Sequence, residues 1–338
     1  MKDTATAVEG RKPLGVVVTG ATGWLGERLA SQLFAEAIPV IAVGRSARPG
    51  PWQCFHEADI TRAGFGDGLS EMLGAARAWA IVHCAGLAHR PLETPSVCRL
   101  MHEINAEGTR RVVDLCGTLG ITRFVYASSI SVYDWSSRAG DAPRTEESGV
   151  APSSAYAASK LGGEDAVRAS GLDWTIVRLA TIFGEGDRAN FAKLAQSLRR
   201  RVFVLPGAGT ARKSVISVDD AARCLSALAT SSLASRQTLN LAYVEAPTLR
   251  VICEELAAVC GVSRPASLPV SLLRCVARCG DMAQALNLPA PLSTATLRKL
   301  TTSTEVDCGR AGRILPVLES SGFSEAMRRV GDSYRRQA

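Results

Sequence analysis

The sequence is poor in aromatic residues, in histidine and in paired cysteines. Aromatic residues make up 5% of the 338 residues, which argues against a basic surface interleaved with rings for nucleic acid. The ten cysteines form no CxxC pair, and the four histidines have no spacing that suggests a metal site. We therefore expect no nucleic-acid partner and no metal, and the scattered thiols indicate a reducing compartment.

Two kinds of apolar segment are also missing. No stretch reaches the roughly 18 to 20 apolar residues that a membrane span needs, and the N-terminal MKDTATAVEGRKP lacks the apolar core of a signal peptide. We therefore expect a cytoplasmic protein with a flexible N-terminus over residues 1–12. The formal net charge is +7, much of it in short basic clusters. Such clusters suit a solvated surface with a few cations that face an anionic small molecule.

The first half of the sequence alternates apolar runs with longer amphipathic segments. The apolar runs predict β-strands at Gly15–Thr19, Pro39–Val43, Ala80–Cys84, Phe124–Ser128 and Trp174–Arg178. The segments between them predict helices at Leu25–Ala37, Arg99–Leu119 and Ala155–Ser170. Buried strands separated by helices predict an α/β fold with a doubly wound parallel sheet of the Rossmann type.

The rhythm of the sequence changes after Phe183, where helices are expected around a short β-rich stretch. We therefore predict a Rossmann domain over residues 13–182 and a smaller, mainly substrate-binding C-terminal lobe over residues 183–338. Residues 212–230 are expected to pack back on the first domain. The site would lie in a cleft between the two parts.

The segment TGATGWLG, residues 19–26, places three glycines between the first strand and the first helix. A turn of this kind points backbone N–H groups and the positive end of the helix dipole at a phosphate. Gly20 permits the tight turn, Gly23 lets a phosphate approach the backbone, and Gly26 lets the helix pack closely on the strand. The spacing is GxxGxxG rather than GxGxxG, but its position after the first strand predicts a dinucleotide pyrophosphate site.

The end of the second strand bears on which dinucleotide binds. An acidic residue there would favour NAD, whereas this chain has Arg45, followed by Ser46 and Arg48. A cation suits the 2′-phosphate of NADP, so we predict NADP as the preferred cofactor and NAD as the alternative. Asp59 follows a third expected strand, and two interpretations of it stay open, a contact to the adenine amino group and a helix N-cap.

A second motif, YAASK, places Tyr156 and Lys160 four residues apart on a predicted helix, and thus on one face of it. The ammonium would lower the pKa of the phenol and so make it usable as an acid or base near neutral pH. Upstream, the strand that contains YASS ends in hydroxyl groups, one of which can hold a substrate oxygen. With the glycine turn, these motifs predict hydride transfer in which Tyr156 moves the proton.

In these motifs the chain resembles the extended short-chain dehydrogenase/reductases, the NAD(P)-dependent epimerases, dehydratases and reductases of nucleotide sugars. The resemblance covers nearly the whole chain and includes VHCAG, NAEGTRRVVDLC, VRLATIFGEG and SVDDAA. It implies that Ser129 is the catalytic hydroxyl, that Tyr156 is the general acid/base, and that Lys160 is its partner and holds the nicotinamide ribose. It also implies that Asn105 supports the site and that Asp59 contacts the adenine.

The resemblance assigns the remaining binding residues as well. Those expected to contact the cofactor are Gly20, Gly23, Trp24, Leu25, Gly26, Arg45, Asp59, Ile60, Cys84, Ala85, Gly86, Asn105 and Lys160. Those expected to contact the substrate are Ser129 and, at the diphosphate, Asn190 and Lys213 or its neighbour Arg212. Asp134 and Ala180 depart from the usual family pattern and leave the identity of the sugar open.

The expected reaction is reduction of a 4-keto group of a nucleoside-diphosphate hexose, with UDP-linked sugars favoured. Two alternatives stay open: a UDP-hexose 4-epimerase that retains NAD, and a reductase or dehydrogenase of a lipophilic, steroid- or flavonoid-like compound. The resemblance further implies a homodimer, formed through the helices at 99–119 and 155–170.

Overall fold

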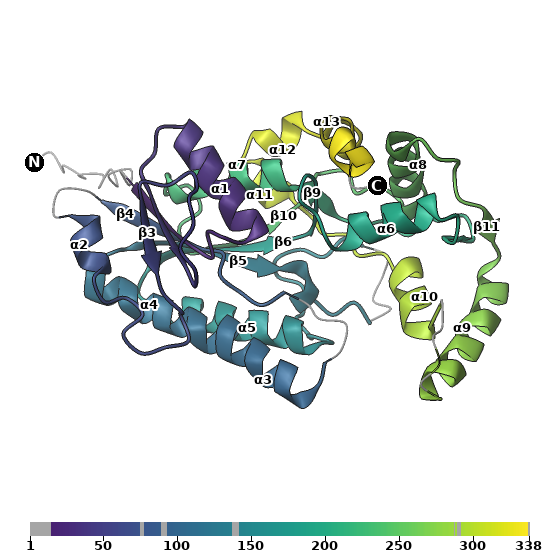
Figure 1. The fold of residues 1–338 in the computed structure, drawn as a ribbon, viewed down its shortest axis with the longest axis horizontal. Helices are drawn as coiled ribbons and strands as arrows, with labels where there is room; N and C mark the ends of the chain where they lie inside the picture. The colour runs from purple at the N-terminus through teal and green to yellow at the C-terminus, as the bar shows by residue number, and fades with distance from the viewer. Residues whose placement is uncertain are drawn as a thin grey trace, which may run out of the picture. The chain divides into compact units, whose positions relative to one another are not determined.

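The computed structural model describes residues 15–74, 78–88, 93–136, 142–286, 288 and 292–336. Its main sheet has seven strands in the order β10-β6-β5-β4-β1-β2-β3 (Figure 1). These strands are β1 Gly15–Thr19, β2 Val40–Gly44, β3 Cys54–Glu57, β4 Trp79–His83, β5 Arg123–Ser129, β6 Asp173–Leu179 and β10 Gln237–Leu241. β1 pairs in parallel with β2 and β4, β2 with β3, and β4 with β5. The predicted α/β fold with a Rossmann-type sheet is confirmed.

Helices cover both faces of this sheet. The helices α3 (Pro95–His102), α4 (Gly108–Leu119) and α5 (Ala155–Arg168) lie on one face, and α1 (Trp24–Ala35) lies on the other (Figure 1). Because both faces are covered, the central strands are apolar at almost every position, and β1 and β2 are buried throughout. In such a sheet, ligands bind at the carboxyl ends of the strands, next to the point where the strand order reverses. Here the reversal lies between β1 and β4.

The helix expected at Arg99–Leu119 begins earlier and is not uniform. It starts at Pro95, where the Thr94 hydroxyl accepts a hydrogen bond from the Val97 N–H at 3.3 Å. A π-helical turn, Glu103–Glu107, then separates α3 from α4. Such a turn inserts an extra residue and changes which side chains face the sheet, and π-turns often occur at functional sites. Asn105, predicted to support the site, lies in this turn and is fully buried.

A buried carboxylate attaches α5 to the sheet. Glu164 of α5 is 0% exposed, and its Oε1 accepts hydrogen bonds from Ser128 Oγ at 2.5 Å and Arg178 Nε at 3.0 Å. Its Oε2 accepts from Arg178 Nη2 at 2.8 Å and Arg168 Nη2 at 2.6 Å. Burial by itself would raise the pKa of Glu164, but Arg178, with Ser128 and Arg168, holds that pKa below its ordinary value. The charge therefore stays ionised and fixes α5 against β5 and β6.

The chain divides into two compact units. Unit 1 comprises the described residues up to Val132 together with Pro152–Arg178 and Ala222–Leu239, and unit 2 comprises Tyr133–Ala151, Leu179–Ala221 and the described residues from Asn240 onward. Unit 1 also holds the short helix α2, Leu69–Leu73, and the first part of α7, Val218–Ala229, lies in unit 2. Each unit has its own core.

Unit 2 is built around aromatic rings. Its elements are β7 Thr181–Phe183, α6 Asn190–Arg199, β8 Leu205–Pro206, β9 Val215–Ser217, α8 Leu249–Cys260, β11 Ser267–Leu268, α9 Val270–Ala285, α10 Thr294–Thr301, α11 Gly309–Gly312, α12 Val317–Ser320 and α13 Phe323–Arg336. Phe183 stacks on Phe191 with ring centroids 4.9 Å apart, and Phe323 lies edge-on to Phe183 at 5.4 Å. All three rings are buried, so they join β7, α6 and α13 in one core.

We predict that Arg178→Met lowers the free energy of unfolding at neutral pH by about 3 to 5 kcal/mol, because it leaves the buried Glu164 charge without its main cation. Arg168→Met is the matched control. Its guanidinium is 35% exposed, so its loss should cost less than about 1 kcal/mol. Urea unfolding followed by circular dichroism measures both values.

The same pair of variants has an expected pH dependence. The folded-state pKa of Glu164 is lowered, so its contribution is present above the ordinary value of 4.5 and is lost as pH falls through the folded pKa. In Arg178→Met the carboxylate can instead take up a proton, so the deficit should shrink on acidification. Equal losses in Arg178→Met and Arg168→Met, or a deficit independent of pH, would contradict this account.

Candidate active site

The glycine turn after β1 is shaped by two close approaches. Gly20 has φ +70°, and a Cβ there would lie 2.6 Å from the backbone of Ala85, in the loop after β4. A Cβ on Gly26 would overlap the carbonyl oxygen of Gly20. Both positions therefore need glycine, one for its backbone conformation and one for the packing of α1 on the turn. No side chain caps the N-terminus of α1, which begins after Gly23. This cradle of backbone N–H groups fits a dinucleotide pyrophosphate.

The ends of β2 and β3 hold the residues predicted to face the adenosine half of the cofactor. The Asp59 carboxylate accepts hydrogen bonds from the Thr61 N–H at 3.0 Å and the Thr61 hydroxyl at 2.8 Å. These bonds, with the nearby charges of Arg45 and Arg62, hold the pKa of Asp59 below its ordinary value. Asp59 closes a turn, and the helix that follows begins only at Leu69, so the N-cap interpretation is wrong.

The two arginines after β2 differ in their surroundings. Arg48 donates to the Thr22 carbonyl at 2.9 Å and pairs with Glu27 at 2.6 Å, which holds it against the start of α1. Arg45 is exposed at the end of β2, next to Asp59. Arg45 is therefore the more available cation for a phosphate group at this position.

The loop after β4 is held by the π-turn. Asn105 Oδ1 accepts from the Leu87 N–H at 2.7 Å, and its Nδ2 donates to the Leu87 carbonyl at 3.0 Å and to Ser159 Oγ at 2.9 Å. The amide thus ties this loop to α5. A Cβ on Gly86 would lie 3.0 Å from Asn105 Oδ1 and 3.9 Å from Lys160 Nζ. Gly86, Asn105 and Lys160, all predicted cofactor residues, therefore lie together.

A buried polar chain connects the same loop to β1. His83, 0% exposed, lies 2.6 Å from Thr19 Oγ1 through Nδ1 and 3.0 Å from Thr109 Oγ1 through Nε2. Burial, with the charge of Lys160, lowers the pKa of His83 to about 3, so the ring is neutral. Thr109 Oγ1 donates to the Asn105 carbonyl at 2.7 Å and must therefore accept from His83 Nε2–H. The ring then accepts a hydrogen bond from Thr19 through Nδ1.

The predicted reacting groups come together at the end of β5 and on α5. α5 begins after Ser154, whose hydroxyl accepts from the Ala157 N–H at 3.1 Å, so Tyr156 lies in its first turn. Burial raises the pKa of Tyr156, and a hydrogen bond with Ser129 opposes that rise. Ser129 Oγ accepts from the Ser131 N–H at 3.2 Å and from Ser131 Oγ at 2.9 Å. Because Ser129 Oγ accepts both of these bonds, its own proton is the one directed at the Tyr156 phenol oxygen.

Lys160 lies one turn further along α5 and is buried. Its Nζ lies 4.2 Å from the centroid of the Tyr126 ring, a cation–π contact. Burial lowers the pKa of Lys160 to about 8, although Cys84 and Glu164 oppose this shift. The spacing of YAASK predicts that Lys160 lowers the pKa of Tyr156. In the structure burial of the phenol outweighs any such effect, because the pKa of Tyr156 is raised.

Several residues of this region were missed by the sequence analysis. Glu164 falls at the i+8 position from Tyr156, and Ser128 directly precedes Ser129, but nothing in this spacing indicates that the Glu164 carboxylate is buried. His83 was set aside because four dispersed histidines do not suggest a metal, and its role as a neutral link between two threonines leaves no trace in the sequence. Within the described residues no three His, Cys, Asp or Glu side chains gather as a metal site would require.

Two further predicted cofactor residues have clear surroundings. The Ile60 side chain is buried in the core of unit 1, so only its backbone is available to a ligand. Burial raises the pKa of the Cys84 thiol to about 12, which keeps it neutral beside the nicotinamide half of the predicted site. Trp24 and Leu25 are half-buried in the first turn of α1.

The predicted substrate residues of unit 2 differ in availability. Lys213 Nζ donates to the Lys299 carbonyl at 2.8 Å and to the Thr302 carbonyl, so it caps the C-terminal end of α10, and burial lowers its pKa to about 8. Arg212 is exposed, donates to the Ala246 carbonyl at 3.0 Å and lies 3.9 Å from a Glu305 carboxylate oxygen. Of the two basic neighbours, Arg212 is the more accessible to an anionic ligand, and Asn190 is exposed at the first residue of α6.

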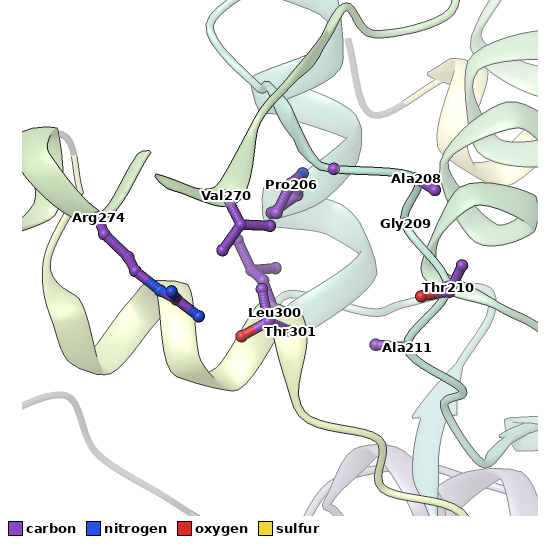
Figure 2. A pocket seen from close by; sticks show the side chains of 10 residues that line it. Pro206, Ala208, Gly209, Thr210, Ala211, Val270, Arg274, Leu300 and Thr301 are labelled. Carbon is purple, nitrogen blue, oxygen red and sulfur yellow. The ribbon is translucent and has the colours of Figure 1, made fainter. Parts of the chain in front are cut away.

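Unit 2 also holds an open cavity of about 260 Å³ beside this segment (Figure 2). One wall is the stretch 206–211, which directly precedes Arg212 in the sequence. The other walls are Val270 and Arg274 of α9, and Leu300 and Thr301 of α10. Small and apolar residues, two threonines and one guanidinium thus line the cavity.

The fold and these sites define a dinucleotide-binding protein of the Rossmann class with a Ser–Tyr–Lys constellation. The family model described as "NAD dependent epimerase/dehydratase family" matches residues 16–242, and the chain belongs to that family.

The chain spans less than two thirds of the length of the two curated relatives named next. UDP-glucose 4-epimerase of Vibrio cholerae is 26% identical over 218 residues, which is 62% of this chain and 65% of that protein. Ceramide reductase of Caulobacter vibrioides is 32% identical over 211 residues, 61% of this chain and 58% of that protein. A structure of MoeE5 in complex with UDP-glucose and NAD superposes with a TM-score of 0.70, at 24% identity, over 95% of this chain and 99% of that one. This last likeness shows the fold.

We predict that Gly26→Ala weakens dinucleotide binding at least tenfold and lowers the free energy of unfolding by about 1 to 3 kcal/mol, because its Cβ overlaps the Gly20 carbonyl. Gly117→Ala is the matched control, since nothing lies within 4 Å of a Cβ there and the residue is exposed in α4. It should bind normally and gain up to about 1 kcal/mol. Fluorescence titration with reduced dinucleotide and thermal unfolding report both effects. Wild-type binding by Gly26→Ala would contradict this account of the turn.

Proposed function

We propose that the protein is an NAD(P)-dependent oxidoreductase of nucleotide sugars that reduces a 4-keto group of a UDP-linked hexose. The observation that carries this proposal is the meeting of Ser129 and Tyr156, with Lys160 one turn away, in the same unit as the glycine cradle. The triad residues are the acid, the orienting hydroxyl and the cation that reduction of a ketone requires.

Ser129, Tyr156 and Lys160 each have a separate role in the proposed reaction. The Ser129 hydroxyl, whose oxygen is held by Ser131, donates to the substrate oxygen and orients it. Tyr156 is protonated at neutral pH because burial raises the pKa of its phenol, and it delivers that proton to the oxygen as the carbonyl becomes an alcohol. Lys160, still mainly protonated below pH 8, stabilises the phenolate left behind. When bound, the dinucleotide supplies the hydride.

The residues present fit a dinucleotide along the carboxyl ends of β1, β2 and β4. The cradle of Gly20, Gly23 and Gly26 would hold the pyrophosphate, and Asp59 would face the adenine. Exposed Arg45 supports the 2′-phosphate of NADP over NAD. Asn105 would hold the loop that borders the nicotinamide half.

The substrate class rests on unit 2 and on the relatives. Exposed Arg212, with Asn190, suits a nucleoside diphosphate, because a guanidinium pairs with phosphate oxygens. UDP-glucose is the sugar nucleotide in the name of the Vibrio relative and in the MoeE5 complex, which supports a UDP-linked hexose.

A UDP-hexose 4-epimerase that retains NAD is the second candidate. It would use the same three side chains, and the Vibrio cholerae relative favours it. A reductase of a lipophilic ketone is the third, and the Caulobacter ceramide reductase favours that. Arg45 disfavours the epimerase, because an enzyme that recycles bound NAD does not need a cation that binds a 2′-phosphate group.

The cofactor separates the first two candidates. We predict that the purified protein binds NADPH at least tenfold more tightly than NADH, and that Arg45→Gln removes this preference without weakening NADH binding. Arg48→Gln is the matched control, because its guanidinium is held by Glu27 and Thr22, and it should change the preference much less. Fluorescence titration gives the affinities. Stoichiometric NAD released on denaturation, with little affinity for NADPH, would contradict the reductase and support the epimerase.

The reaction should depend on pH through Lys160. Its pKa of about 8 predicts that kcat/KM for ketone reduction falls as pH rises above 8, because the ammonium loses its charge there. We predict that Lys160→Met lowers kcat/KM by about 100- to 10,000-fold and removes this alkaline limb, and that Tyr156→Phe loses a similar factor. Pre-steady-state and steady-state rates across pH with a UDP-4-keto-hexose provide the profiles. If kcat/KM of Lys160→Met still falls above pH 8, a group other than Lys160 causes that fall.

A further inference from the structure

Helix α9 of unit 2 exposes a continuous apolar face. It packs on α10 (Figure 1) through Leu273 and Ala277, which join Leu297 in a small buried cluster. With 100° between successive residues, a second arc of the helix points away from that cluster. The residues on this arc are all exposed, and they are Leu272, Cys275, Val276, Cys279, Met282 and Leu286. We call these six residues the α9 stripe.

The α9 stripe is unusual for a water-facing surface. Met282 is 70% exposed and Leu286 is 71% exposed, and no polar side chain lies within the arc. Other large exposed apolar residues, such as Leu233 at 65%, occur singly or at the ends of elements. A contiguous apolar patch on a soluble surface marks a site that contacts something else.

The size of the α9 stripe argues against a second copy of the chain. A helix of 16 residues is about 24 Å long, so one face about 10 Å wide covers roughly 240 Å². A stable dimer buries about 800 Å² on each partner. The stripe by itself is therefore too small to hold two chains together, whereas a single amphipathic helix binds a lipid surface through its buried apolar area together with its charges.

The charges beside the α9 stripe favour an anionic surface. Arg274 and Arg278 are exposed along one edge of it. The only acidic residue of the helix, Asp281, is engaged elsewhere, because its carboxylate accepts from the Thr294 N–H at 3.0 Å and the Thr294 hydroxyl at 2.6 Å. A helix with an apolar face and a basic border is the pattern that binds the interface of an anionic bilayer.

We propose that unit 2 binds the surface of anionic membranes through α9, with the α9 stripe inserted at the level of the headgroups and its arginines on lipid phosphates. In the described part of the chain, no helix has the length and apolar character needed to cross a bilayer, so the contact is peripheral. This inference goes beyond the proposed function and does not depend on it.

Vesicle sedimentation tests the proposal with the full chain. We expect it to bind vesicles of phosphatidylglycerol mixed with phosphatidylcholine, and to bind phosphatidylcholine vesicles much less. Leu286→Glu should weaken binding about tenfold, because it places a charge in the stripe. Leu233→Glu, at an equally exposed leucine in unit 1, is the matched control and should bind like the wild type. Arg278→Gln should weaken binding about fivefold and reduce its dependence on salt.

Thermal unfolding and dinucleotide titration show that each variant is folded, and both are expected to be unchanged in Leu286→Glu. Three outcomes would overturn the proposal. They are no binding of the wild type to either kind of vesicle, equal loss in Leu286→Glu and Leu233→Glu, and a wild-type dimer that Leu286→Glu dissociates in the absence of lipid. The last outcome, measured by analytical ultracentrifugation, would make the α9 stripe a contact between two chains.

Discussion

The buried ion pair between Glu164 and Arg178 is the constraint on which the site depends. A helix that packed on the sheet through apolar side chains alone could shift along the strands at small cost, since dispersion contacts have little direction. A buried carboxylate must instead meet its donors, and here they come from the ends of β5 and β6. Tyr156 and Lys160 stand two turns and one turn before Glu164 on the same helix, and Ser128 directly precedes Ser129. One buried charge therefore fixes the elements that carry Ser129, Tyr156 and Lys160, the three side chains of the proposed reaction.

A second buried network does the same for the cofactor side. The chain from Thr19 through His83 and Thr109 to Asn105 joins the end of β1, the end of β4 and the π-turn. None of these groups has to touch a ligand. Their function is to hold the glycine cradle and the loop after β4 at a fixed distance, which a pyrophosphate and a nicotinamide require simultaneously. Burial keeps the His83 ring neutral, so the network adds no charge next to Lys160.

The sequence was sufficient for the fold and the glycine turn, because these follow from periodicity and from glycine. It also placed Tyr156 and Lys160 one turn apart on one helix, because of their four-residue spacing. It was not sufficient for Glu164, since a charged residue in a helix ordinarily faces water. The π-turn was also invisible, because residues around Asn105 continue a regular helical pattern. Lys213 meets carbonyl groups more than eighty residues away, a contact that no local pattern contains. The preference for NADP, the homodimer and the cytoplasmic location stay predictions.

The two units have different roles in the proposed reaction. Unit 1 holds Ser129, Tyr156 and the glycine cradle, and in the proposed reaction these act on a carbonyl carbon and its oxygen regardless of what else the substrate carries. Selection of the substrate must therefore come from groups that contact the rest of that molecule. In unit 2, Lys213 is held by carbonyl groups at the end of α10, whereas its neighbour Arg212 is exposed and directly follows the stretch 206–211 that forms one wall of the cavity. A guanidinium pairs with phosphate oxygens, so the proposed preference for a nucleotide-linked substrate depends on Arg212 of unit 2 rather than on the side chains of unit 1.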